Sequence, residues 1–216
     1  MIVKGNLVDC TRENSFLVVE NGVISKIYSQ YELPDALKNE EIEDYGDSLI
    51  LPGLIDMHLH APQFAFRGLG MDMELLDWLN TYTFPEEAKY KDIVYAKKAY
   101  KKFVDTLSKS YSTRAVVFAT LHTDATILLM DMLEESGLKC FVGKVNMDRN
   151  STDELIETTE SSIDSTVKWL DICKDRYKNI KPIITPRFIP SCSDELMKEL
   201  GKIRGDIYGL QSHLSE

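Results

Sequence analysis

Two kinds of hydrophobic pattern alternate along most of the chain. Short continuous apolar runs, such as AVVFATLH and CFVGKVNM, are typical of strands buried on both faces. Between these runs, apolar residues recur every three or four positions, which predicts amphipathic helices. The clearest helical series is Ile93, Ala96, Tyr100, Phe103 and Leu107. Because parallel strands need a helical crossover, the alternation predicts an α/β fold with a parallel sheet.

Turn and cap residues place the predicted elements more closely. From Ser48 onward the expected strands are SLILPGLIDMHLH, AVVFATLH, CFVGKVNM, KPIITPRF and IYGLQSH. Asp124 and Ser193 are expected to cap the helices after the second and fourth strands, and Gly137 and Gly205 to end those helices. A further helix is expected to carry apolar residues from Leu155 to Leu170.

The first fifty residues follow a different pattern. In SFLVVENGVISKIYS, two β-branched runs meet at Asn21-Gly22, which is a strong signal for a β-hairpin. An acidic connector is expected from Tyr31 to Asp47. This part of the chain is therefore predicted to be β-structure, separate from the alternating region.

Composition argues against several classes of partner, although a local basic patch remains an open alternative. The formal net charge of −10 opposes binding to nucleic acids and anionic membranes. No apolar run is long enough to span a membrane, and the N-terminus lacks the pattern of a signal peptide. The cysteines form no CxxC pair, so we expect reduced thiols in a cytoplasmic protein; they are Cys10, Cys140, Cys173 and Cys192.

All four histidines follow predicted strands, at the edge where parallel α/β folds place their active sites. His58 and His60 are two positions apart, so on a strand both imidazoles face the same side and can reach one metal ion. His213 follows the last strand, with Glu216 three residues later. On the residues alone, unrelated loop histidines and a first-turn acid remain an open alternative.

The context of the histidine pair resembles a known superfamily. PGLIDMHLH at a strand end, after an N-terminal β part, resembles the amidohydrolase superfamily, and HLHAPQ, LLDWLNTYTFPEEA, TPRFIPSC and QSHLSE together resemble the guanine deaminase family. The resemblance implies a TIM-like (β/α)8 barrel, incomplete here, with a small β-sandwich. Residues 1–50 would be the N-terminal part of the sandwich, and residues 51–216 the first five βα units of the barrel.

The resemblance also implies a site and an activity. One Zn²⁺ per chain, or Fe²⁺ in its place, would be held by His58, His60 and His213. Glu216 would be the catalytic proton shuttle, and the base would be bound by His60, Gln63, Arg187, Phe188, His213 and Glu216. The implied reaction is hydrolysis of guanine to xanthine and ammonia by a metal-activated water, in a homodimer.

Other interpretations remain open at this point. One alternative is another amidohydrolase, such as a chlorohydrolase or a different aminopurine or pyrimidine deaminase, and a further alternative is a non-catalytic barrel homologue. From the residues alone, TPRF is better explained by Arg187 paired to a surface carboxylate and Phe188 in a core. Trp78 and Tyr82 are expected to pack, and His122 to have a structural role.

Two further expectations concern what the chain lacks. The loop after the fourth predicted strand has no lysine to bridge two metals, which favours a site with one metal. Only five barrel strands can be placed where a TIM-like barrel has eight. We therefore expect a longer protein, with another histidine and an aspartate as ligands beyond residue 216. We expect the 216 residues alone to be insoluble or molten and to release no ammonia from guanine.

Overall fold

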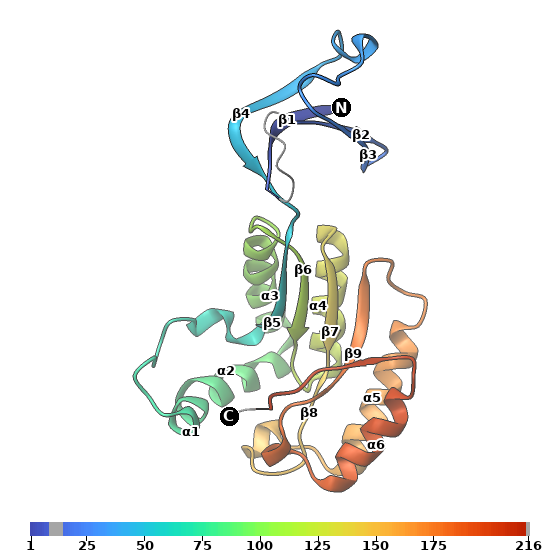
Figure 1. The fold of residues 1–216 in the computed structure, drawn as a ribbon. Coiled ribbons are helices and arrows are strands. Elements are labelled where there is room, and N and C mark those ends of the chain that lie inside the picture. Colours follow the sequence, from blue (N-terminus) through green and yellow to red (C-terminus); the bar gives the residue numbers. More distant parts are fainter. Residues whose placement is uncertain (9–14, 215–216) are drawn as a thin grey trace. The chain divides into compact units, whose positions relative to one another are not determined.

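Four strands make up the first of two units in the chain. The computed structural model describes residues 1–8 and 15–214, and their contacts divide between Gly53 and Leu54 (Figure 1). In the first unit the sheet order is β3-β2-β1-β4, with β4 parallel and β2 antiparallel to β1. The strands are β1 (Ile2–Leu7), β2 (Ser15–Glu20), β3 (Val23–Tyr28) and β4 (Ile42–Ile50).

The predicted hairpin is confirmed, and the predicted connector is partly wrong. Asn21 and Gly22 join β2 to β3 with φ of 52° and 76°, the left-handed values that a type I′ turn requires. The connector was expected to run to Asp47, but β4 begins at Ile42. Most of β4 is exposed, so no apolar alternation marks it, and pairing with β1 decides its structure instead.

The second unit contains a parallel sheet whose strands are joined by helices, as predicted. Its order is β10-β9-β7-β6-β5, and β8 pairs with β9. This arrangement is part of a TIM-like barrel (Figure 1). The strands are β5 (Leu54–His60), β6 (Ser112–Phe118), β7 (Lys139–Gly143), β8 (Val145–Asn146), β9 (Ile180–Pro186) and β10 (Gly209–Leu210).

Helices α3 to α6 form a layer in which each helix packs against the next (Figure 1). A chain of shorter turns between β5 and α3 adds α1, α2 and an intervening π-helical turn, η3. The bounds are α1 (Leu75–Trp78), η3 (Leu79–Thr83), α2 (Phe84–Ala88), α3 (Ile93–Leu107), α4 (Thr123–Ser136), α5 (Thr159–Cys173) and α6 (Asp194–Arg204).

The core of this unit lies between the sheet and the helix layer. Ala115 and Val117 on β6 pair with Cys140 and Val142 on β7, and all four are buried. Because side chains alternate along a strand, Phe141 between them faces the other side and is 42% exposed. The helices contribute large buried side chains to this core, among them Tyr100, Phe103, Leu129, Leu133 and Trp169.

Two predicted helix starts are wrong. The helix α4 begins at Thr123, before Asp124, and His122 at its N-cap makes no side-chain capping bond; Asp124 lies in the first turn, where its charge favours the helix dipole. The helix α5 begins at Thr159 rather than near Leu155, because the Thr158 hydroxyl caps it by accepting the Ser161 N–H.

The predicted end of α4 and both predicted ends of α6 are confirmed. Ser193 caps α6 by accepting the N–H of Leu196 at 3.1 Å, and Gly205 follows its last residue with φ of 48°. Gly137 follows α4 with φ of 79°, a left-handed conformation that a side chain would strain.

Two predicted strands differ from the structure. The run expected to be buried strand ending at His60 divides into β4 and β5, and β5 is largely exposed because it lies at an edge of the sheet. The run CFVGKVNM divides into β7 and β8 around Lys144, whose fully buried ammonium forms an ion pair with Glu157.

Three of the cysteines, Cys140, Cys173 and Cys192, are free and buried, whereas Cys10 lies outside the described residues. None of the helices in the described ranges has the length and apolar character needed to cross a bilayer.

Candidate functional site

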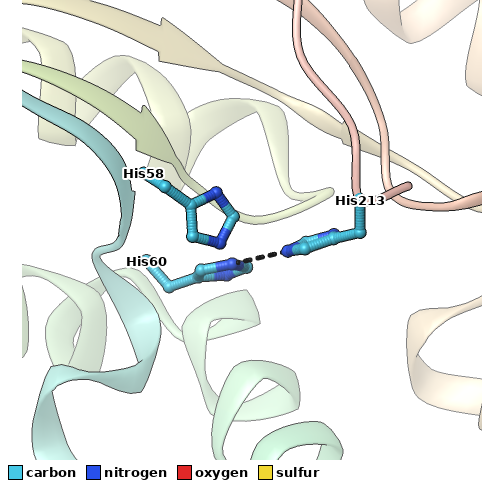
Figure 2. A group of neighbouring side chains, drawn as sticks. All are labelled: His58, His60 and His213. Atoms are coloured by element: carbon cyan, nitrogen blue, oxygen red, sulfur yellow. Dashed lines mark hydrogen bonds between the residues drawn. The ribbon is translucent and has the colours of Figure 1, made fainter. Parts of the chain in front are cut away.

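Three histidines from opposite edges of the sheet meet at the carboxyl ends of the strands. His58 and His60 lie on β5, and His213 follows β10 through a bridge to Phe188. Although β5 and β10 are the two edges of the sheet, one ring nitrogen from each histidine lies within 4.8 Å of the others. Figure 2 shows the three rings facing one another. The sheet is therefore curved enough to bring its two edges to one point.

One hydrogen bond orients the His213 ring, and burial favours the neutral form of His60. His213 Nδ1 lies 2.7 Å from the carbonyl oxygen of Arg187; since a carbonyl can only accept, Nδ1 carries the hydrogen and Nε2 of a neutral ring keeps its lone pair. Burial, followed by the positive charges of Arg187, His213 and His58, holds the pKa of His60 well below its usual value. Neutral imidazole is the form that binds a metal.

The composition of this cluster fits a zinc-type site. Imidazole nitrogens are common ligands of Zn²⁺, and a catalytic site usually has three protein ligands and one open position. His60 is held from both sides: its ring stacks on Phe118 at 4.5 Å between centroids, and its Nε2 lies 3.0 Å from Nε2 of His213. Three imidazoles from two strand ends can thus hold one metal ion.

A cavity of about 300 Å³ opens beside the three histidines. Its walls combine the histidines, two polar side chains and several apolar ones. The lining residues are His58, His60, Gln63, Leu75, Trp78, Leu79, Arg187, Phe188 and His213. Apolar walls with a few convergent polar groups are typical of small-molecule sites.

Arg187 reaches this cavity as half of a buried ion pair. Its Nη1 and Nη2 donate to the two carboxylate oxygens of Glu87, at 2.5 and 3.3 Å, and the two residues are 3% and 2% exposed. The same carboxylate accepts from Nε2 of Gln63 at 3.3 Å, and this amide nitrogen also lies 3.1 Å from Nδ1 of His60. One carboxylate therefore connects the arginine, the amide and the histidines.

Most of the residues predicted for the site line this single cavity. His58, His60 and His213 meet as the predicted ligand set requires, and Gln63, Arg187 and Phe188 lie around the cavity. Glu216 lies outside the described residues.

Other candidates from the sequence lie elsewhere or take other roles. Asp56 accepts the backbone N–H of His58 at 3.1 Å, which is a structural role. Trp78 lines the cavity, whereas Tyr82 stacks on Phe66 and is not among the lining residues. His122 lies apart from the cluster, and burial and nearby positive charges lower its pKa to about 4.

Glu87 is the site residue that sequence reasoning missed. Its segment, FPEEA, places two acids beside apolar residues, and both Glu86 and Glu87 are buried. Two adjacent acids among apolar residues could have signalled a buried ion pair, because a buried carboxylate needs a counter-charge. The partner, Arg187, is 100 residues away in the chain, so the pairing itself could not be inferred.

Comparisons with known proteins agree on one family. The model of the amidohydrolase family matches residues 49–213. The chain is 41% identical over 213 residues to a guanine deaminase of Dictyostelium discoideum, which covers 91% of this chain and 47% of the relative. It is 45% identical over 170 residues to a guanine deaminase of Homo sapiens, covering 77% of this chain and 37% of the relative.

A solved structure extends the similarity to the whole fold. The crystal structure of guanine deaminase from C. acetobutylicum with bound guanine in the active site is 47% identical, with a TM-score of 0.92, covering 100% of this chain and 53% of that one. This chain therefore spans about half the length of the relatives it matches.

Proposed function

This chain belongs to the amidohydrolase family, and we propose that the protein hydrolyses guanine to xanthine and ammonia. The observation that carries the proposal is the convergence of three histidines with Gln63, Arg187 and Phe188 around one cavity. The similarity to guanine deaminases supports the choice of substrate.

The metal in this proposal is one zinc ion, for which Fe²⁺ is an acceptable substitute. His58, His60 and His213 would hold it, because they present three nitrogen ligands within 4.8 Å of one another. When bound, the metal lowers the pKa of water and so supplies a nucleophile near neutral pH.

The cavity residues in this proposal bind and orient the base. The guanidinium of Arg187 donates to acceptor atoms on the purine edge, while the amide oxygen of Gln63 accepts from a purine N–H, because its nitrogen is directed to Glu87 and His60. Phe188, which is 7% exposed, and Trp78 supply flat apolar surface for the ring. Together they direct C2 of the purine, which carries the amino group, toward the histidines.

The proton transfers are assigned to Glu216. Its carboxylate accepts a proton from the attacking water and passes it to a ring nitrogen as the hydroxyl adds at C2. The proton of that hydroxyl then passes to the amino group, which leaves as ammonia while the C2 carbonyl forms. This assignment rests on the resemblance of QSHLSE to the guanine deaminase family.

The test is ammonia release by the complete protein, with adenine and cytosine as competing substrates. Guanine should be the fastest of the three, and a faster reaction with adenine or cytosine would disprove the substrate. Glu216→Gln should keep its metal while kcat falls by roughly 10² or more, since an amide cannot cycle a proton. Near-normal turnover in this variant would remove Glu216 from the mechanism.

Two assignments accompany this function as proposals. We propose a homodimer, which light scattering of the purified protein tests directly, and a cytoplasmic location, which fractionation of the native cells tests.

A further inference from the structure

The buried carboxylate of Glu87 has no role in the reaction proposed above, yet it contacts two of the residues that line the cavity. It accepts hydrogen bonds from both Nη atoms of Arg187 and from Nε2 of Gln63. Glu87 is not itself among the residues that line the cavity. Its position behind the arginine and the amide points to an effect transmitted through those two side chains.

The first effect is on orientation. Two parallel N–H···O bonds fix the plane of a guanidinium, which a single bond does not. A carboxylate can only accept, so it also selects the nitrogen end of the Gln63 amide and leaves the amide oxygen for another donor. Glu87 thereby orients Arg187 to present a hydrogen-bond donor, and Gln63 to present an acceptor, to the same cavity.

The second effect is on charge. Among the described side chains that line the cavity, Arg187 is the only one with a permanent charge, and it is almost completely buried. An unpaired buried guanidinium would strongly attract an anion, because the local dielectric constant is low. The negative charge of Glu87 cancels that attraction while leaving other N–H groups of the arginine able to donate.

We infer that Glu87 is a positioning and specificity-determining residue, which makes the cavity select a neutral ring with adjacent hydrogen-bond acceptors and donors over an anionic ring. The inference rests on the proposed function in taking the ligand to be a purine. An N–H between two carbonyl groups is more acidic than the N–H of the aminopurine, so the same pair also disfavours the anionic form of the deaminated product.

The experiment compares two oxypurines by calorimetry on the complete, metal-loaded protein near neutral pH. Hypoxanthine is neutral under these conditions and urate is an anion. In Glu87→Gln, which keeps the size of the side chain but removes its charge, the affinity for urate relative to hypoxanthine should rise by roughly tenfold or more over the parent. Because the two ligands keep their shapes, the change in this ratio reports the charge.

The matched control is Glu86→Gln, one position away on the same helix. Glu86 is also buried, but it pairs with Lys89 and does not line the cavity. This variant should leave the urate-to-hypoxanthine ratio at the parental value. An equal rise in both variants would overturn the inference, since it would reflect loosening of α2 rather than a charge beside Arg187.

If Glu87→Gln does not fold, the double variant with Arg187→Gln carries the test, because it buries no unpaired charge. The affinity of the double variant should fall for both ligands, while the urate-to-hypoxanthine ratio stays within about threefold of the parent. A large gain in affinity for urate would overturn the inference.

An unchanged urate-to-hypoxanthine ratio in a folded Glu87→Gln variant would also overturn the inference. Neither binding ratio needs turnover, so failure of the parent to release ammonia from guanine would disprove the proposed function separately.

Discussion

Individual side chains at the carboxyl ends of the strands have more than one task. Arg187 lines the cavity through its guanidinium, pairs with Glu87, and accepts the Nδ1–H of His213 with its backbone carbonyl. Removing one partner of such a buried pair typically costs about 3–5 kcal/mol, so a truncation would mix loss of stability with loss of binding. Conservative substitutions are therefore the informative ones here.

Replacing Arg187 with lysine keeps the positive charge but removes the planar fork. We expect Arg187→Lys to raise KM for guanine by at least roughly tenfold, because lysine cannot form the paired bonds that orient the group. Metal content should stay normal, since the histidine rings are untouched. Steady-state kinetics with elemental analysis checks this, and an unchanged KM would remove Arg187 from base recognition.

His60 provides a matched test of the metal cluster. Elemental analysis of the complete protein should find close to one transition metal per chain, and His60→Ala should lose most of it, because one of the three nitrogen ligands is removed. The control is His122→Ala, since His122 also follows a strand but does not belong to the cluster. Equal metal loss in both variants would contradict the assignment.

Whole elements are positioned here by their ends as much as by their apolar faces. Thr158 and Ser193 cap α5 and α6 by accepting N–H groups of the first turn, and Gly137 and Gly205 end α4 and α6 with positive φ. These local features fix where each crossover helix stops and the next strand begins. The strand ends that carry the site depend on them.

Two glycine substitutions should change the free energy of unfolding in opposite directions, depending on whether the glycine ends a helix or lies inside one. Gly137→Ala should lower the free energy of unfolding by about 1 kcal/mol or more, because alanine is strained at φ of 79°. Gly201→Ala should raise it by about 0.5–1 kcal/mol, because Gly201 lies inside α6 with open space around its Cα. Urea unfolding of the complete protein measures both free energies. A stabilising effect of Gly137→Ala would show that the left-handed conformation at the end of α4 does not require glycine.

In the second unit as a whole, the site joins parts of the chain that are distant in sequence. His60 and His213 are 153 residues apart and come from the two edges of the sheet, yet their Nε2 atoms are 3.0 Å apart. A metal held by both would therefore connect β5 to the segment after β10. Its contribution to stability would act on the entire sheet rather than on one loop.

Removal of the metal should consequently destabilise the protein as well as inactivate it. Chelation is expected to lower the midpoint of thermal unfolding by on the order of 5 to 10 °C and to stop ammonia release, because a ligand that binds only the folded state stabilises it. Zinc should restore both. In His60→Ala the midpoint should no longer respond to chelation, and a full response there would place the metal elsewhere.

The sequence by itself determined those features that depend on neighbours in the chain. The Asn21-Gly22 hairpin, the C-terminal end of α4, both ends of α6, and the alternation of strands and helices follow from local geometry and hydrophobic period. The placement of His58 and His60 on one strand end was also local. The family followed from four separated motifs, which a single sequence already contains.

The tertiary structure decided what depends on distant partners. The polar strand β4 forms through pairing with β1, and β5 is exposed because the sheet order makes it an edge. Glu87 became part of the site only through Arg187, which the curvature of the sheet and the packing of α2 bring to it. Pairings of this kind leave no periodic signal, because their free energy arises from burial and charge between residues that the sequence separates widely.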